Sequence, residues 1–399
     1  MTPTLIIGKG NPYQIGHTTG SHFAPFVQAN LSAFWRGLSD VGKSRSWLIG
    51  KAVEEKALLS EHLIDEIAGI ADGSCLSFDE VLAYNLYGGT VFPDGCTVMM
   101  AVGAAGHNGN TLFMKNSDQV GGDSMVGAGF DQNKEIYVIQ VIVPDQGNAM
   151  VGVSAAGRTG LKMGLNDKGV ATGSNIARTV ELRERKVDIT KVRASDRTQL
   201  MRQGLGKDTA ASAASTIAGL ILENPTSTPG NIEFADAKEA VVIEGSYTHQ
   251  ALEVIRDRVA ARANRFQVLE HTNDPTDVSS VCRYQRCMEL LRENEGHLTL
   301  EKFIEFSRDH ANGPGPNSIC RHGHHYREET SLGAAVIEIE RDDPKKSKIV
   351  MALGKPCHAW RDPAGQVTLT MDRLSDALPS GFTDGGVWKQ FYSEEARLP

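Results

Sequence analysis

Cys96 lies where a turn meets a strand, in the segment VFPDGCTVMM of residues 91–100. Pro-Asp-Gly is a common turn sequence, and a thiol that opens a strand is usually a small buried apolar group. A cysteine that acts as a nucleophile also needs a base to accept its proton and donors that stabilise an oxyanion. The chemistry open to Cys96 therefore depends on the groups that the fold brings to it.

The α-amino group of Cys96 itself would be a suitable base, because such a group has a pKa of about 7.7–8. The group becomes free only if the peptide bond between Gly95 and Cys96 is cut. Glycine tolerates the backbone strain that attack on its carbonyl requires. We therefore expect the Cys96 sulfur to attack the Gly95 carbonyl and to form a thioester, which water hydrolyses. This autocleavage would leave Cys96 at the start of the larger fragment.

A second group of potentially reactive residues lies near the C-terminus, in and after the segment ICRHGHHYREE. Zinc takes thiolate and imidazole ligands in tetrahedral sites. The spacing matches no closed Cys/His module, and a buried thiol with imidazoles bonded to backbone explains the segment equally well. We expect no metal and no cofactor, with a structural metal site as the alternative. The residues concerned are Cys320, His322, His324, His325, Cys357 and His358.

The elements that must position Cys96 change in character at that residue. Before it, apolar residues recur at helical spacing over residues 20–38 and 54–73. Ser77 and Glu80 have the spacing of a capping box, which predicts that another helix begins there. We therefore expect a mostly helical segment of about ninety residues ahead of the cysteine.

After Cys96 the pattern indicates many strands with interspersed helices. Helices are predicted at about 195–223 and within 281–312, whereas residues 251–264 fit neither a strand nor a helix period. The order of these elements is not the regular alternation of a parallel doubly wound sheet. Antiparallel sheets with helix layers are therefore favoured.

The composition limits the possible partners. A formal net charge of −8 disfavours nucleic acid or an anionic membrane surface. The sequence contains no apolar run of membrane-spanning length and no signal-peptide pattern, so we expect a cytoplasmic location. Six scattered cysteines in such a chain argue against a disulfide framework.

An ordered set of motifs resembles the acyl-coenzyme A:isopenicillin N acyltransferase family of N-terminal nucleophile (Ntn) hydrolases, which are distantly akin to penicillin V acylases and bile salt hydrolases. The first motifs are Gly69-Ile70-Ala71, Gly95-Cys96-Thr97 and Asn116-Ser117-Asp118. The resemblance extends over roughly residues 10 to 360. Later segments that carry it are GLKMGLNDKGVATGSN with Asn166, PGNIEFADAKEAVVIE with Asn231, ARANRF, SSVCRYQRCMELL with Arg283, and SICRH through GKPC.

The resemblance implies a role for each matching residue. Cys96 would be the nucleophile, Asp118 would orient it or its amine, and Arg283 would steady the surroundings or a substrate carboxylate. Asn231 would donate its side-chain amide to the oxyanion. Asn166 would lie near the thiol and lend a backbone N–H, and Thr97 belongs to the same oxyanion and substrate-binding group. Each polar residue also has a simpler explanation, as a turn residue or a surface ion pair.

The fold implied is a four-layer αββα Ntn-hydrolase sandwich with two stacked antiparallel sheets. Residues 1–95 would be a helical pro-segment and 96–399 the catalytic chain, and the two fragments would stay associated as one integrated domain. The activity implied is hydrolysis or transfer of the acyl group of a small amide, with a homo-oligomer possible. One alternative is an acyl-CoA-dependent N-acyltransferase of the same fold. Another is an uncleaved, non-catalytic binding protein with a structural Cys/His metal site.

Overall fold

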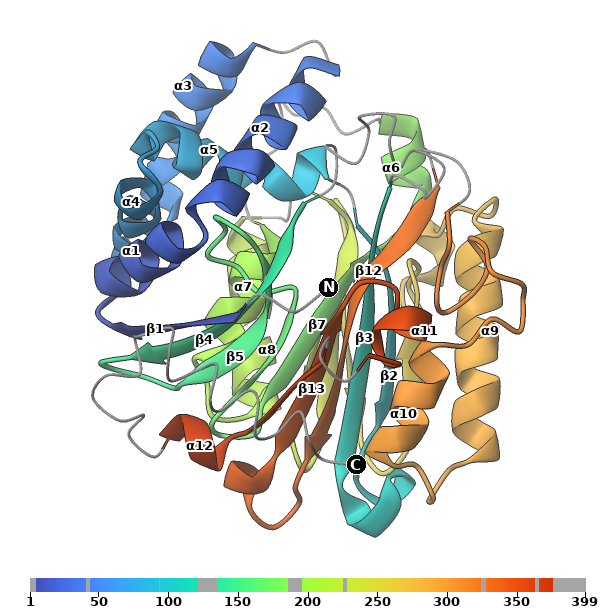
Figure 1. Cartoon of the computed structure of the whole chain (residues 1–399). Coiled ribbons are helices and arrows are strands. Elements are labelled where there is room, and N and C mark those ends of the chain that lie inside the picture. Colours follow the sequence, from blue (N-terminus) through green and yellow to red (C-terminus); the bar gives the residue numbers. More distant parts are fainter. Residues whose placement is uncertain are drawn as a thin grey trace.

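The structure is a computed structural model that describes residues 5–40, 44–92, 94–120, 135–185, 196–224, 228–323, 328–362 and 366–375. Two β-sheets lie face to face, and helices cover the outer face of each sheet (Figure 1). Apolar side chains of both sheets, among them Val98, Val151 and Ile337, form a core between them. The predicted α+β class and the four-layer αββα arrangement are therefore confirmed.

The larger sheet has eight strands within the described residues, in the order β1-β4-β5-β6-β7-β8-β9-β10. Its neighbouring strands are antiparallel except for β1 and β4, which run parallel. The prediction of wholly antiparallel sheets is thus wrong at this edge. The strands are β1 (Leu5–Gly10), β4 (Tyr137–Pro144), β5 (Met150–Ala155), β6 (Met163–Asn166), β7 (Ala171–Ile176), β8 (Gly230–Ala235), β9 (Ala240–Gly245) and β10 (Gln250–Ile255).

The smaller sheet has the order β11-β2-β3-β12-β13-β14, and its neighbouring strands are all antiparallel. Strand β2 carries Cys96 and pairs with β3 along its whole length, whereas β11 pairs only with its later residues, Val98 to Ala101. Cys96 therefore has a strand partner on the β3 side, and its other side is open to the residues that follow β11. The strands are β2 (Asp94–Ala101), β3 (Thr111–Val120), β11 (Val259–Arg262), β12 (Glu329–Ile339), β13 (Lys348–Leu353) and β14 (Gln366–Thr370).

The described residues before Cys96 form five α-helices, and the sequence pattern predicts three of them, at about 24–40, 61–74 and 78–91. Their apolar faces pack together and against the larger sheet, where Phe34 and Tyr84 share a core with Val138 and Ala156. Two details differ from the expectation, because the predicted helix over 20–38 is broken at Phe23 and a second break follows Glu55. The helices are α1 (Pro12–His22), α2 (Ala24–Asp40), α3 (Arg45–Glu55), α4 (Glu61–Ser74) and α5 (Phe78–Val91).

The predicted capping box at the start of α5 is not formed. Ser77 does occupy the N-cap position, but its side chain makes no capping hydrogen bond. Glu80, the other member of the box, forms an ion pair with Arg45 instead. The motif therefore predicts the start of the helix correctly and its contacts wrongly.

Helices of the later chain complete the outer layers. Helices α7 and α8 cover the larger sheet, and helices α9 and α10 cover the smaller one (Figure 1). No helix among the described residues combines the length and apolarity that crossing a membrane needs. The helices are α6 (Val180–Arg185), α7 (Arg197–Leu205), α8 (Ala210–Glu223), α9 (Val278–Glu293), α10 (Leu300–Ser307), α11 (Pro356–Ala359) and α12 (Asp372–Ser375).

The stretch 251–264, whose period is ambiguous in the sequence, carries the chain from one sheet to the other. Strand β10 ends the larger sheet, and after a short turn β11 pairs with β2 in the smaller sheet. Each of the two short strands belongs to a different sheet and buries its own face. A single alternation of apolar and polar residues therefore does not run through the stretch. The crossing brings the residues that follow β11 next to Cys96.

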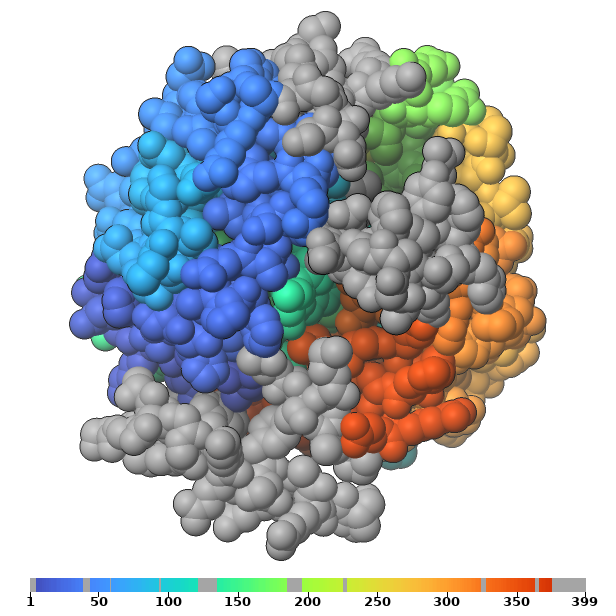
Figure 2. Space-filling view, turned by 45° about the horizontal axis from the view of Figure 1, so that its top comes forward, coloured from blue at the N-terminus to red at the C-terminus, as the bar shows by residue number. Residues whose placement is uncertain are grey.

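The segment before Cys96 is built into the rest of the fold. Strand β1 extends the larger sheet through its parallel pairing with β4. In Figure 2 the blue atoms of this segment form one side of the surface and lie directly against later parts of the chain. The expectation of a mostly helical segment does not include strand β1, because its short apolar run LIIG is too brief to show a period.

Candidate active site at the Gly95–Cys96 bond

The side chain of Cys96 is directed between the two sheets. Alternate residues of a strand share one face, and Val98 and Met100 belong to the core between the sheets. Cys96 has the same parity and is fully buried. Gly95 and Thr97 therefore face the opposite side, toward the helix layer that covers the smaller sheet.

Two buried side chains hold the backbone of Cys96, and we call them the Asn264–Arg283 clamp. The Cys96 N–H donates to Oδ1 of Asn264 over 3.3 Å, and the Cys96 carbonyl accepts from Nη1 of Arg283 over 2.7 Å. Nη2 of Arg283 donates to the same Asn264 oxygen over 2.7 Å, which links the two side chains. The nitrogen that cleavage would release thus already contacts a hydrogen-bond acceptor.

Arg283 is fixed from α9 by further contacts. It donates to Oγ1 of Thr97 over 2.8 Å and to the hydroxyls of Ser279 and Ser280 over 3.3 Å. Burial lowers the pKa of Arg283, whereas the charge of Asp118 acts to raise it. An arginine remains cationic at neutral pH despite such a shift. Thr97 therefore serves the clamp and lies on the face opposite the thiol.

Asp118 lies directly across from Gly95 in the pairing of β2 with β3. Its Oδ1 accepts a hydrogen bond from the Ser331 hydroxyl over 2.6 Å. Its Oδ2 is 3.5 Å from Nη1 of Arg321, and neither of these two atoms has a hydrogen-bond partner within the described part of the chain. The carboxylate of Asp118 and the guanidinium of Arg321 therefore form a buried ion pair beside the bond in question.

Gly95 is the residue that this arrangement requires. A methyl group added at Gly95 would lie 2.5 Å from Nη1 of Arg321, so a larger residue would displace the guanidinium. Nη2 of Arg321 pairs with Glu329 over 2.8 Å. Burial and the like charge of Arg283 lower the pKa of Arg321 to about 9, which leaves it cationic at neutral pH. Two buried guanidinium groups thus flank the Gly95–Cys96 unit.

Asn231 lies in β8 and contacts the residue that follows Asn264, not the clamp itself. Its side-chain nitrogen donates to the carbonyl of Arg265 over 3.2 Å and to Oδ1 of Asn175 on β7. Both side chains are buried, and Oδ1 of Asn231 and Nδ2 of Asn175 have no partner among the described residues. Asn231 thus supports the segment that carries Asn264, and the unpaired amide donor of this pair belongs to Asn175.

Asn166 lies at the far end of the larger sheet. Its amide donates to the carbonyls of Leu205 and Lys207, and its oxygen accepts from the N–H groups of Lys168 and Val170. The whole of β7, about 17 Å of strand, separates this turn from the end that contacts Asn264. The expectation that Asn166 lies near the thiol is therefore wrong, and the residue is a turn residue.

The contributions of Asn264 and Arg321 are not evident from the sequence alone. Both lie inside segments that the family resemblance covers, ARANRF and SICRH, but neither is singled out by its spacing to Cys96. Their contacts with the Gly95–Cys96 unit depend on the crossing between sheets and on the segment beside β12. Arg321 is also flanked by Cys320 and His322, two of four side chains that could hold a metal.

Comparisons with known proteins find likeness in fold only. No protein-family model matches the sequence, and no curated protein matches it. Among solved structures, the N-acylethanolamine-hydrolyzing acid amidase ortholog of Caenorhabditis elegans is 13% identical with a TM-score of 0.42, covering 61% of this chain and 92% of its own.

Two further solved structures are of enzymes to which the family named above is distantly akin. Penicillin V acylase from Agrobacterium tumefaciens is 12% identical with a TM-score of 0.41, covering 65% of this chain and 83% of its own. A mutant conjugated bile acid hydrolase from Clostridium perfringens is 8% identical with a TM-score of 0.42, covering 70% of this chain and 93% of its own. Similarity this low carries no argument about function by itself.

Proposed function

We propose that the chain is a self-processing cysteine amidohydrolase of the Ntn type, which cuts itself between Gly95 and Cys96 and then uses Cys96 on a small amide. The observation that carries this proposal is the Asn264–Arg283 clamp on both polar groups of the Cys96 backbone. Burying a guanidinium costs free energy unless all its N–H groups find acceptors. Packing alone therefore does not explain an arginine at position 283.

The cleavage would begin with attack of the Cys96 sulfur on the Gly95 carbonyl carbon. Nη1 of Arg321, which lies beside Gly95 and forms an ion pair with Asp118, would donate to the oxyanion that forms. The C–N bond then breaks while the Cys96 nitrogen takes up the thiol proton, which leaves a thioester. Water hydrolyses this thioester, with Oδ2 of Asp118 as the base. The products are a Gly95 carboxylate and an N-terminal Cys96 with a free thiol.

The same residues support catalysis in the cut enzyme. The new α-amino group would stay bonded to Oδ1 of Asn264 and accept the thiol proton as the sulfur attacks a substrate carbonyl. The Arg283 cation nearby lowers the pKa of such an amine and so favours its neutral form. The unpaired amide nitrogen of Asn175 would donate to the oxyanion, or the amide of Asn231 would do so after leaving its present acceptors. The leaving amine takes a proton from the α-ammonium, and water hydrolyses the thioester.

The proposed substrate class is a small linear amide, such as an N-acyl amino acid, a peptide-like amide or a β-lactam side-chain amide. The cationic site favours an acyl amide that carries a carboxylate, and Arg265 beside Asn264 is half-buried and adds a further charge. Transfer of the acyl group to another amine would use the same thioester. Measuring how the thioester partitions between water and added amines separates a hydrolase from an acyltransferase.

The direct test is a denaturing gel with intact mass spectrometry of the purified protein. Wild type should give two fragments, 1–95 and 96–399, whose summed mass exceeds that of the full chain by one water molecule. Cys96→Ala should give one full-length band and no activity on an amide library, because the nucleophile is missing. Cys75→Ser, at an exposed cysteine, is the matched control and should be cut like wild type. A single full-length wild-type band from folded protein would favour the uncleaved binding protein.

A further inference from the structure

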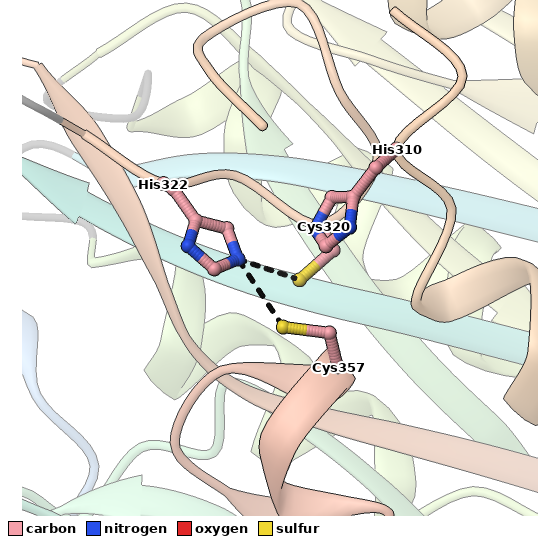
Figure 3. Close-up of side chains that lie close together, drawn as sticks. All are labelled: His310, Cys320, His322 and Cys357. Atoms are coloured by element: carbon pink, nitrogen blue, oxygen red, sulfur yellow. Dashed lines mark hydrogen bonds between the residues drawn. The ribbon is translucent and has the colours of Figure 1, made fainter. Parts of the chain in front are cut away.

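Four side chains from three separate segments come together beside the proposed active site. They are His310, which follows α10, Cys320 and His322 in the extended segment before β12, and Cys357 in α11 (Figure 3). Each offers one potential ligand atom, and all four atoms lie within 4.8 Å of one another. His324 and His325, the other imidazoles of the same sequence segment, lie outside the described residues.

The spacing of these atoms matches a tetrahedral metal site. Bonds of about 2.0–2.3 Å to a central ion place four tetrahedral ligand atoms about 3.3–3.8 Å apart. Nε2 of His322 is 3.7 Å from the Cys320 sulfur and 3.2 Å from the Cys357 sulfur (Figure 3). The separations therefore need little adjustment when an ion enters.

His310, the fourth residue of the group, has a ring nitrogen that is free to bind a metal. Nε2 of His310 is buried and has no hydrogen-bond partner among the described residues. A buried ring nitrogen without a partner is costly, and a metal ion at this position would satisfy it. The unpaired nitrogen is thus the one left to bind.

We propose that His310, Cys320, His322 and Cys357 bind one zinc ion. Two thiolates and two imidazoles in a tetrahedral arrangement are the ligand set that zinc prefers. All four positions are filled by protein, as in structural sites, so the ion would hold segments together and take no part in catalysis. This site does not depend on whether the chain cuts itself.

The ion would also fix the position of Arg321. Cys320 and His322 direct their side chains to the metal, while Arg321 between them reaches Asp118 and Gly95. The same segment is held on its other side by β12, where Arg321 exchanges hydrogen bonds with Ser331. Zinc would therefore anchor the strand-like segment that supplies the donor beside the Gly95–Cys96 bond.

The test measures metal on the full-length protein, purified after growth with added zinc. Elemental analysis after dialysis should find one zinc ion per chain. Replacement by Co²⁺ should give the visible d–d bands of a tetrahedral site and a thiolate charge-transfer band. Cys320→Ser and Cys357→Ser should each bind at least about 100-fold more weakly, because a first ligand matters no less than the groups that orient it. His358→Ala is the control and should keep the metal.

Two results would overturn the zinc site. One is folded wild-type protein without zinc or cobalt binding and with all thiols free. The other is a Cys320–Cys357 disulfide, seen as two missing thiols that return on reduction without metal uptake. The same measurements in Cys96→Ala separate the two proposals, since the uncut variant should bind zinc as wild type does. If a cysteine variant does not fold, the wild-type cobalt spectrum still decides the matter.

Discussion

Asn264 joins the nitrogen of Cys96 to the guanidinium of Arg283 through a single amide oxygen. We predict that Asn264→Ala slows self-cleavage about 100-fold, because the scissile unit loses its alignment. Asn264→Asp keeps the acceptor and should retain most of the rate. Time courses on a denaturing gel measure both.

Asn294→Ala is the matched control for this prediction, because within the described part of the chain its amide bonds the carbonyl of Leu290, at the end of its own helix. Cleavage of this variant should match wild type. A folded Asn264→Ala protein that cuts itself at the wild-type rate would show that the clamp has no part in the reaction.

Glu233 is a fully buried carboxyl group whose two oxygens have no partner among the described residues. Burial raises its pKa from 4.5 to about 7, against the opposing charges of Lys115 and Arg262. The folded state holds the Glu233 proton more tightly than the unfolded state does. The resulting contribution to the free energy of unfolding is therefore complete below about pH 4.5 and is lost as the pH rises through about 7. The difference corresponds to roughly 3 kcal/mol.

We therefore predict that the protein with Glu233 loses stability as the pH rises from about 5 to about 8. Glu233→Gln should abolish this dependence on pH, because the amide does not titrate. Urea unfolding of the uncut Cys96→Ala protein, with and without the second change, measures the effect free of fragment dissociation. The double variant should be the more stable one at the higher pH. Equal dependence on pH in both proteins would contradict a titrating Glu233.

Helices α1 and α4 touch along glycines, an arrangement that belongs to the scale of elements. A methyl group on Gly16 would lie 2.0 Å from the Glu66 carbonyl oxygen, and one on Gly69 would lie 2.1 Å from that of Tyr13. The backbones are in direct contact, so an added methyl group must separate the helices. Gly69 is also the first residue of the Gly69-Ile70-Ala71 motif, which here has a packing role.

We predict that Gly69→Ala lowers the free energy of unfolding by about 1–3 kcal/mol through overpacking. Gly50→Ala in α3 is the control, since no atom lies within 4 Å of the added group and the change should stabilise the helix by about 0.5–1 kcal/mol. Urea unfolding in the Cys96→Ala background compares them. The packing argument fails if both variants unfold at the same urea concentration.

At the scale of the whole molecule, the segments on either side of the proposed cut share one core and one sheet. Phe34 and Tyr84 pack with Val138 and Ala156, and β1 pairs with β4. We predict that the two fragments of the cut enzyme elute as one species in native size-exclusion chromatography. They should separate only in denaturant, because dissociation would expose this apolar surface to water. Fragments that part under native conditions would contradict an integrated domain.

Much of the architecture was open to prediction from residue patterns because it depends on local periods. The sequence pattern predicts helices α2, α4 and α5, the hairpin of β8 and β9 and the strand that begins near Cys96. Strand β1 and the crossing from β10 to β11 do not, since each piece is shorter than a readable period. Their existence depends on the partner strands beside them.

The sequence by itself determined that a cysteine follows a turn at Gly95 and opens a strand, and that a set of polar motifs follows it in order along the chain. Only the tertiary structure decided which of those polar groups meet. Asn264 lies 168 positions from Cys96 and Asn166 only 70, yet Asn264 makes the contact. The reason is physical: hydrogen bonds and metal ligands require atoms within a few ångströms, and strand order, which local periods leave open, sets those distances.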